Sequence, residues 1–343
     1  MQIILFTHFA QLKNSEYFAE FQQFIEQVPA GNFFQSPEFL QFIEPVGGYK
    51  PFLWLALSGS GRIQGSLLGV IQSDGGGVKS WLSRRLIIWG GPVVADGVSV
   101  NKTDIARALL ETMKKTARGS AIFIEFRNFF DCSGLHSSFE SSGFLFRPHL
   151  NYVVRLDDEK AVTGRLSSNR RRQIRSSMNA GAVVTEPESE ADVLAFYELL
   201  VRLYREKVKK PLPSLDLFMQ FWKSPSSKTF LVKYNGQVVG GSVGPVYRNE
   251  TIYQWYVCGD NGVIQGVHPS VLASWAPIEY GLKNGYKYFD FMGAGRPDEE
   301  YGVREFKARF GGDELSYGRY ELVLSRPLYK VGKLGLKVYQ SLR

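Results

Sequence analysis

The sequence predicts an α/β (α+β) protein built from two similar domains in tandem, each with a mixed, mostly antiparallel sheet. Three observations predict this. The chain has 343 residues, which is more than one hydrophobic core normally organises. Hydrophobic residues make up 44% of the chain and charged residues 22%, as in folded globular proteins. The third observation is that the order of segments in the first half recurs in the second.

This internal repeat pairs four segments of each half. The first half contains GRIQGSLLGV (61–70), LIIWGGPVV (86–94), NKTDIARALLETMKKTARGSAIFIEFRN (101–128) and a segment ending in HLNYVVRL (149–156). The second half contains GQVVGGSVGPV (236–246), TIYQWYVCGD (251–260), HPSVLASWAPIEYGLKNGYKYFDFMGAG (268–295) and a segment ending in GRYELVL (318–324). Ile122 corresponds to Tyr288, and Val153 to Tyr320, so the register is kept. We therefore expect a duplicated domain, with boundaries at 1–157 and 158–343.

Each half is expected to begin with helices and to continue with a β-hairpin, a strand, a helix and further strands. The N-terminal residues MQIILF predict a first strand rather than a signal peptide, because no basic leader precedes the apolar residues. Apolar spacing predicts helices over 16–28, 101–118, 188–210 and 270–284. Thr103 is the expected N-cap of the second of these, and Asn284-Gly285 supplies the stop of the last. The strands IFIEF and KYFDFM follow the two repeated helices.

The composition excludes several classes of site. Cys132 and Cys258 form no CxxC pair, and the four histidines lack the spacing of metal ligands, so we expect neither a disulfide scaffold nor a metal site. No G-x-S-x-G elbow is present, which argues against a serine nucleophile. The sequence contains no apolar run of about 18 residues, so it predicts no transmembrane helix. The net charge of +8 favours an anionic partner.

The positive charge is concentrated between the two copies. The segment GRLSSNRRRQIRSSMNAGAVVTEP (164–187) carries five arginines within eleven residues. On a helix, Arg171 and Arg175 would share one face. Arginine binds phosphate bidentately, so these two residues are candidate ligands for a phosphate backbone. The alternative is a solvated helix face.

The stretch FDFMGAGRPDEEYGVREFKARFGG (289–312) combines an apolar strand, a glycine turn and an acidic loop. Gly293 and Gly295 would let the backbone approach a ligand closely. Asp298 and Tyr301 lie on the loop expected to cover a cleft, where Asp298 is either a base or a solvated carboxylate. Asp290 lies inside the strand and is either a buried structural carboxylate or a base.

Three motifs together resemble a known family. They are FFQSPEF near the start, NRRRQIRSSMNAGA at the opening of the second half, and the stretch from Phe289 to Gly312. The chain resembles the FemA/FemB/FemX (FemABX) aminoacyltransferases, of the type without a long helical arm. The resemblance implies two tandem GNAT-like (acyl-CoA N-acyltransferase-like) domains. It also implies an amide-forming transfer of an amino acid from aminoacyl-tRNA, the co-substrate, to an amine of a peptidoglycan precursor, with no other cofactor.

The resemblance also implies roles for single residues. Lys307 follows Phe306 as a lysine does at the family's acceptor site, so it would stabilise the oxyanion while the Phe306 backbone helps to place the acceptor. The alternative is a surface lysine on a strand. The family places basic residues around the phosphates of its precursor; here one such position is Gln41, and the other is Lys209 or Lys210. That departure leaves room for another amine-bearing glycan as acceptor.

Two other functions remain open from the sequence. One is an acyl-CoA-dependent N-acyltransferase acting on an amino sugar or surface polysaccharide, although DNGVIQGVHPSVL (260–272) lacks the arginine and spacing of a CoA-binding loop. The other is a non-catalytic protein that binds RNA or an anionic glycan. The C-terminal PLYKVGKLGLKVYQSLR is basic and partly amphipathic, and either touches an anionic membrane or packs on the domains. We expect a cytoplasmic protein; the oligomeric state is not predicted.

Overall fold

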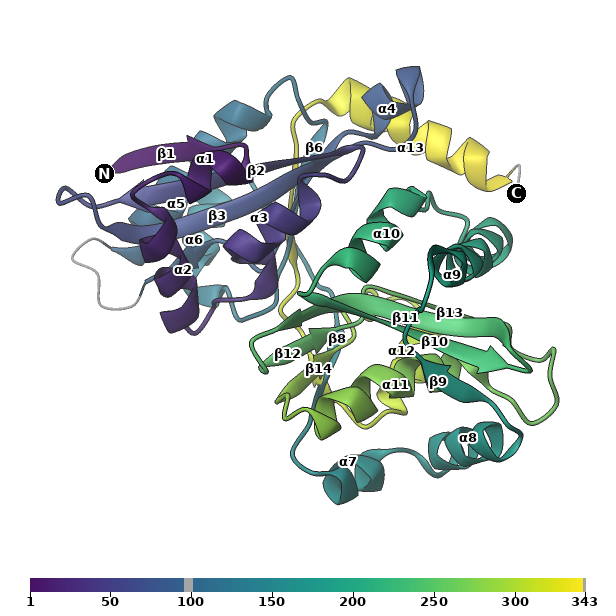
Figure 1. Ribbon diagram of the computed structural model, residues 1–343. Helices are drawn as coiled ribbons and strands as arrows, with labels where there is room; N and C mark the ends of the chain where they lie inside the picture. The colour runs from purple at the N-terminus through teal and green to yellow at the C-terminus, as the bar shows by residue number, and fades with distance from the viewer. Residues whose placement is uncertain (96–100, 342–343) are drawn as a thin grey trace. The chain divides into compact units, whose positions relative to one another are not determined.

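The computed structural model describes residues 1–95 and 101–341, which form two compact units (Figure 1). The first unit comprises Met1–Pro148 together with the C-terminal segment that begins at Tyr317, and the second comprises His149–Ser316. This division differs from the expected boundaries at 1–157 and 158–343. The difference has a simple cause, because one strand from each half of the chain belongs to the sheet of the other half.

The first unit contains one sheet with the strand order β1-β2-β3-β4-β6-β16-β7, and β5 pairs with β3. The strands are β1 (Gln2–Phe6), β2 (Tyr49–Leu57), β3 (Ile63–Gln72), β4 (Arg85–Trp89), β5 (Val93–Val94), β6 (Phe123–Arg127), β7 (Leu145–Arg147) and β16 (Arg319–Val323). The α-helices are α1 (Phe9–Lys13), α2 (Phe18–Gln27), α3 (Pro37–Ile43), α4 (Gly77–Ser83), α5 (Lys102–Ala117), α6 (His136–Ser141) and α13 (Arg326–Ser341).

The second unit repeats this plan, with the strand order β9-β10-β11-β12-β14-β8-β15 and β13 paired with β11. The strands are β8 (Asn151–Arg155), β9 (Val183–Thr185), β10 (Ser227–Tyr234), β11 (Gln237–Tyr247), β12 (Thr251–Tyr253), β13 (Tyr256–Gly259), β14 (Tyr288–Asp290) and β15 (Asp313–Leu315). The α-helices are α7 (Glu159–Arg165), α8 (Ser168–Asn179), α9 (Glu190–Leu203), α10 (Leu215–Lys223), α11 (Pro269–Lys283) and α12 (Gly302–Ala308).

The two sheets correspond strand for strand, which confirms the tandem α/β fold expected from the repeat. In each sheet the helix-linked pair, β4 with β6 and β12 with β14, is parallel, and the other pairings within the described residues are antiparallel. The equivalent strands β8 and β16 are exchanged. Val153 of β8 pairs with Asp290, and Tyr320 of β16 pairs with Phe126. Because Val153 and Tyr320 occupy matching positions of the repeat, sequence similarity does not indicate which sheet each strand joins.

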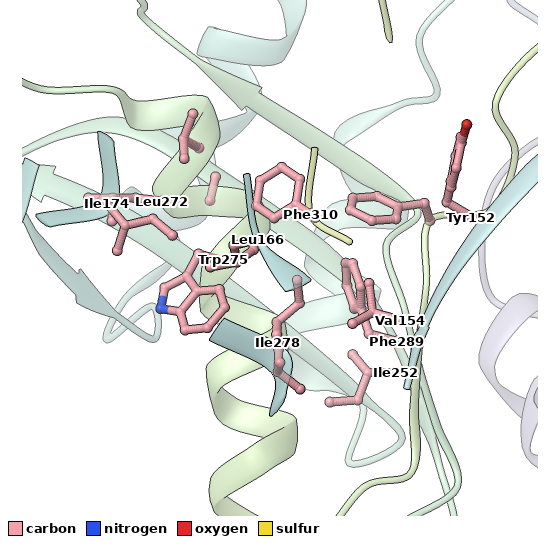
Figure 2. Close-up of a cluster of buried hydrophobic side chains, with 14 of the residues drawn as sticks. Tyr152, Val154, Leu166, Ile174, Ile252, Leu272, Trp275, Ile278, Phe289 and Phe310 are labelled. Atoms are coloured by element: carbon pink, nitrogen blue, oxygen red, sulfur yellow. The ribbon is translucent and has the colours of Figure 1, made fainter. Parts of the chain in front are cut away.

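Helices cover both faces of the second unit's sheet. A Cβ atom on Gly240 would meet Pro269 of α11, and one on Gly241 would meet Phe196 of α9. Successive residues of a strand point to opposite faces, so α11 and α9 lie on opposite sides, as Figure 1 shows. Figure 2 shows the apolar cluster to which α11 contributes, in which Ile278 lies between Trp275 and the side chains of Phe289 and Val154. Burying each such side chain contributes roughly 1.5–3 kcal/mol.

Some local expectations require correction. The N-cap of α5 is Asn101 rather than Thr103, because the Asn101 side chain accepts the hydrogen bond from the Thr103 N–H at 3.1 Å. The helix expected over 188–210 ends as α9 at Leu203 and is followed by a π turn, Tyr204–Val208. Both cysteines are buried and free. Within residues 1–95 and 101–341, no helix combines the length and the apolar character needed to cross a bilayer.

Candidate functional site

The sheet of the second unit opens where β12 continues into β13. Strand β12 runs parallel to β14, and the Gln254 N–H donates the next hydrogen bond, to the Asp290 carbonyl at 2.9 Å. Beyond it the two chains take different partners. Strand β13 continues along β11, whereas Phe291 N–H donates to the Tyr152 carbonyl and the chain follows β8. The two strands therefore separate beyond Gln254 and Asp290.

Lys307 lies beside the start of this opening. Its Nζ donates to the carbonyl oxygens of Phe291, at 2.9 Å, and Gly293, at 2.6 Å. Burial lowers the pKa of Lys307 to about 8, and the nearby Asp290 carboxylate partly opposes the shift. The residue lies on α12 and is partly buried, so the alternative of a surface lysine on a strand is wrong. Its ammonium group has a third N–H for an incoming oxygen.

Asp290 occupies the last position of β14 and is almost completely buried. Its Oδ1 accepts hydrogen bonds from Asn151 Nδ2 at 2.7 Å and from the Met292 N–H at 2.6 Å. Burial raises the pKa of Asp290, while these two bonds and the Lys307 charge act in the opposite direction. The carboxyl group thus holds the turn after β14, where Met292 adopts a left-handed φ of 57°.

The loop after β14 is organised by its own backbone and by one arginine. The guanidinium of Arg304 donates to four main-chain carbonyls of the loop, those of Ala294, Arg296, Pro297 and Glu299. Gly293 and Gly295 both have positive φ, and Gly293 N–H donates to Asn151 Oδ1 at 2.6 Å. A Cβ atom on Gly295 would lie 2.7 Å from the ring of Tyr301. The two glycines therefore permit a tight loop on which the half-exposed Tyr301 ring rests.

Helix α12, which carries Lys307, is fixed to α8 by Arg170. The Arg170 guanidinium lies over the Phe306 ring at 4.2 Å and over Phe310 at 5.1 Å, and it donates to the Phe306 carbonyl at 3.2 Å. Arg170 is buried, and desolvation lowers its pKa to about 10. The Phe306 backbone is expected to help place the acceptor, and its carbonyl already accepts this hydrogen bond from Arg170.

The other arginines of α8 serve different purposes. Arg171 donates to the Thr163 and Gly164 carbonyls and so caps the end of α7. The Arg175 side chain is exposed, and it has no hydrogen-bond or ion-pair partner within the part of the chain that the structure describes. Lys210 is exposed after the π turn. Asp298 is exposed and pairs with Arg296 at 3.0 Å, which is the arrangement of a solvated carboxylate.

The N-terminus of α11 uses all of its own donors. Pro269 has no N–H, and the Ser270 N–H donates to Asn261 Oδ1 at 3.2 Å. The next two N–H groups, of Val271 and Leu272, donate to the His268 carbonyl. A helix N-terminus binds phosphate through unpaired N–H groups, and the first turn of α11 presents none of its own.

Aromatic side chains line the β13 strand. Tyr256 lies 5.1 Å from the Phe218 ring and 6.4 Å from the Tyr204 ring. Burial raises the pKa of Tyr204 to about 12, with a smaller contribution from Tyr301.

The sequence analysis did not identify this aromatic group, and it did not identify Asn151 or Arg304. The available signals in the sequence were a polar residue at the start of a strand, for Asn151, and an arginine shortly after an acidic loop, for Arg304.

Metal coordination has no evident place among these groups. In the described ranges, 1–95 and 101–341, no cluster of three His, Cys, Asp or Glu side chains is arranged to hold a metal ion.

Comparison with known proteins identifies the fold. Residues 166–307 match the family model described as an acetyltransferase (GNAT) domain. FemX is 14% identical with a TM-score of 0.68, covering 96% of this chain and 99% of its own. A tandem GNAT protein from the clavulanic acid biosynthesis pathway is 13% identical with a TM-score of 0.63, covering 94% and 98%. L-PGS from Bacillus licheniformis is 13% identical with a TM-score of 0.57, covering 94% and 96%. No curated protein matches in sequence.

These matches confirm the expected architecture and the resemblance to FemX at the level of fold. The family model lies within the second unit and includes the opening between β13 and β14 and the residue Lys307. The protein is therefore a tandem GNAT-fold protein, and residues 166–307 of its second unit match the acetyltransferase (GNAT) domain model.

Proposed function

We propose that the protein is an amide-forming aminoacyltransferase that moves an aminoacyl group from aminoacyl-tRNA to an amine of a peptidoglycan precursor. The observation that carries the proposal is the Lys307 ammonium group beside the opening of the second sheet, held by the carbonyls of Phe291 and Gly293. The motifs shared with the FemA/FemB/FemX family support the choice of donor and acceptor. We place the reaction in the cytoplasm, where aminoacyl-tRNA is available.

The chemistry needs little more than position and charge. The acceptor nitrogen attacks the ester carbonyl carbon, a C–N bond forms, and the carbonyl oxygen becomes negative. Lys307 stabilises that oxygen with its remaining N–H and keeps its proton throughout. The ester C–O bond then breaks, and the ribose hydroxyl leaves with the proton that the attacking nitrogen gives up. No metal or redox partner is needed for the balance of this step.

The geometry at α11 favours tRNA over CoA as the donor. A GNAT enzyme holds CoA pyrophosphate on the N–H groups of the loop and helix that follow its central strand. Here Ser270 N–H is held by Asn261, and the loop is fixed to α8 because Ser176 Oγ donates to the Gly266 carbonyl at 2.8 Å. Ser177 Oγ also accepts the His268 N–H at 2.8 Å. At the first turn of α11, a pyrophosphate would have to displace the hydrogen bond that the Ser270 N–H donates to Asn261.

Exposed arginines on α8 offer an alternative anchor for a phosphate backbone. Arg175 is exposed without a protein partner among the described residues, and the exposed Arg172 bonds only to Asn169. Two arginines on one short helix can contact successive phosphates of a nucleic acid. We assign phosphate binding to Arg172 and Arg175 rather than to Arg171, because the Arg171 guanidinium donates a hydrogen bond to the Thr163 carbonyl of α7.

An acyl-CoA-dependent N-acyltransferase acting on an amino sugar or surface polysaccharide is the second candidate. It is favoured by the family model, which describes an acetyltransferase domain over residues 166–307.

The decisive experiment supplies both donors to the purified protein. Bulk tRNA charged with radiolabelled amino acids, or radiolabelled acetyl-CoA, is incubated with an amine-bearing muramoyl pentapeptide. We expect transfer from tRNA, giving a product whose label resists the mild alkali that hydrolyses aminoacyl esters. Transfer from acetyl-CoA alone would establish the second candidate. Transfer from neither, by a protein that binds tRNA with steep salt dependence, would favour the non-catalytic alternative.

A further inference from the structure

The C-terminal helix α13 and the adjacent helix α4 leave large apolar side chains exposed on the first unit. Its side chains Val331 and Leu334 are 50% and 64% exposed, and Trp81 on the adjacent helix α4 is 46% exposed. Most large apolar side chains of a stable domain are covered, so a group of three on two neighbouring helices indicates a surface that meets something.

Basic side chains border this area in a regular order. Arg326, Lys330, Lys333 and Lys337 follow one another at spacings of four, three and four residues, which places them along one side of α13. All four are exposed. On the helical wheel, where each residue advances by about 100°, Leu334 lies next to this row and Val331 lies beyond Leu334. We call Trp81, Val331, Leu334 and the lysines Lys330, Lys333 and Lys337 the α13 surface.

The opposite side of α13 is attached to the protein. The Tyr329 ring packs against Phe123 of β6 with centroids 5.5 Å apart. Gly332 lies against α4, because a Cβ atom there would be 3.0 Å from the Leu82 carbonyl oxygen. Figure 1 shows α13 crossing α4. The orientation of the helix is thus determined by contacts on its packed side, which leaves the α13 surface facing outward.

The positive charge of the α13 surface indicates which kind of partner it binds. Neither α4 nor α13 contains an aspartate or a glutamate. Directly after α4, the guanidinium of Arg84 lies 5.7 Å from the Trp81 ring centroid, so positive charge extends to the indole. A nucleic acid would pair with the lysines but would leave the leucine, valine and tryptophan in water. An anionic bilayer satisfies both parts, because its headgroups attract lysine and its interface accepts apolar side chains and indole rings.

We propose that the α13 surface docks the protein on an anionic lipid bilayer, with α13 parallel to the membrane plane. Val331, Leu334 and Trp81 enter the interface, and the lysine row contacts the headgroups. The proposal does not depend on the donor or acceptor of the reaction, and it holds for a catalytic or a non-catalytic protein.

The test is sedimentation of the full chain with vesicles. One set contains phosphatidylglycerol and phosphatidylcholine, and the other phosphatidylcholine alone. Val331→Glu is compared with Val263→Glu, because Val263 is also exposed, at 72%, and lies on a loop of the second unit. Lys330, Lys333 and Lys337 are changed together to glutamine and compared with the same change at Lys13, Lys50 and Lys160, which are also exposed. Both triple variants lower the net charge from +8 by the same amount.

We expect the parent protein to sediment with the anionic vesicles and not with the neutral ones. Val331→Glu and the α13 triple variant should each weaken binding at least tenfold, while both control variants stay within about twofold. Equal loss in Val331→Glu and Val263→Glu, or no sedimentation of the parent protein, would overturn the proposal. Unchanged vesicle binding by the α13 triple variant, together with loss of tRNA binding, would assign the lysines to RNA instead. Unfolding curves confirm that each variant remains folded.

Discussion

The ammonium nitrogen of Lys307 lies 2.6 Å from the main-chain carbonyl oxygen of Gly293, at the turn that follows β14. The contact joins a helix to the place where the second sheet opens. A cation in this position is costly to bury, as its lowered pKa indicates, and a glycine with a φ of 119° is required to present the carbonyl. The buried ammonium group and the glycine with positive φ are each unfavourable alone and stabilise each other here. Such a combination is more typical of a functional site than of ordinary core packing.

Replacing Lys307 by methionine should abolish most of the transfer while leaving the fold intact. Methionine fills a similar volume but removes the charge beside the oxyanion, for which we expect a loss of about 10²–10³-fold in kcat. Transfer from charged tRNA measures the loss, and circular dichroism checks the fold. Full activity in a folded variant would remove Lys307 from the mechanism.

The pH profile should separate charge from shape. Because the pKa of Lys307 is about 8, the protonated fraction falls as the pH rises through 8, and kcat/KM should fall with it. Lys307→Arg keeps its charge well above this pH. The variant should therefore retain part of the activity and lose the alkaline fall. A fall at the same pH in both proteins would assign that ionisation to another group.

Arg170 should act on stability, because it holds α12 against α8. Arg170→Met removes the hydrogen bond to the Phe306 carbonyl and the contact with the Phe306 ring. We expect the free energy of unfolding to fall by about 1–3 kcal/mol in urea titrations. Arg175→Met is the control, since Arg175 is exposed on the same helix and its loss should change stability by less than about 0.5 kcal/mol. Equal effects in the two variants would contradict this role.

Asn261 should be a helix cap rather than a ligand group. Asn261→Ala removes the acceptor of the Ser270 N–H at the start of α11, for which we expect a loss of about 0.5–2 kcal/mol in the free energy of unfolding.

Calorimetric titration of the parent protein with acetyl-CoA should give no heat of binding. Micromolar, stoichiometric binding by the parent protein would contradict our reading of this helix end.

Gly295 should tolerate alanine less well than another glycine of similar backbone geometry. Gly295→Ala introduces a Cβ atom 2.7 Å from the Tyr301 ring, in addition to the strain of a φ of 81°. Gly285 has a φ of 72° but nothing within 4 Å, so Gly285→Ala carries the backbone strain alone. We expect about 1 kcal/mol for Gly285→Ala and a larger cost, with reduced transfer, for Gly295→Ala. Equal stability and activity would show that the position of Tyr301 is unimportant.

The sequence predicted the architecture because the repeat is a local pattern. The strand residues around Ile122 and Tyr288 and the helices after Asn101 and His268 show their periodicity within short windows. The parallel pairing of the strands before and after each repeated helix follows from these elements. The glycine turn at Gly293 and Gly295 was also predicted, since positive φ favours glycine.

The tertiary structure alone decided which groups meet. The exchange of β8 and β16, the division of the α8 arginines between packing and solvent, and the use of Arg304 by a loop all depend on contacts between residues distant in sequence. Composition showed that the chain is basic, and local spacing showed where its helices lie. The depth at which Arg170 and Lys307 are buried depends on the packing of α12, and that packing determines which charges remain available to a ligand.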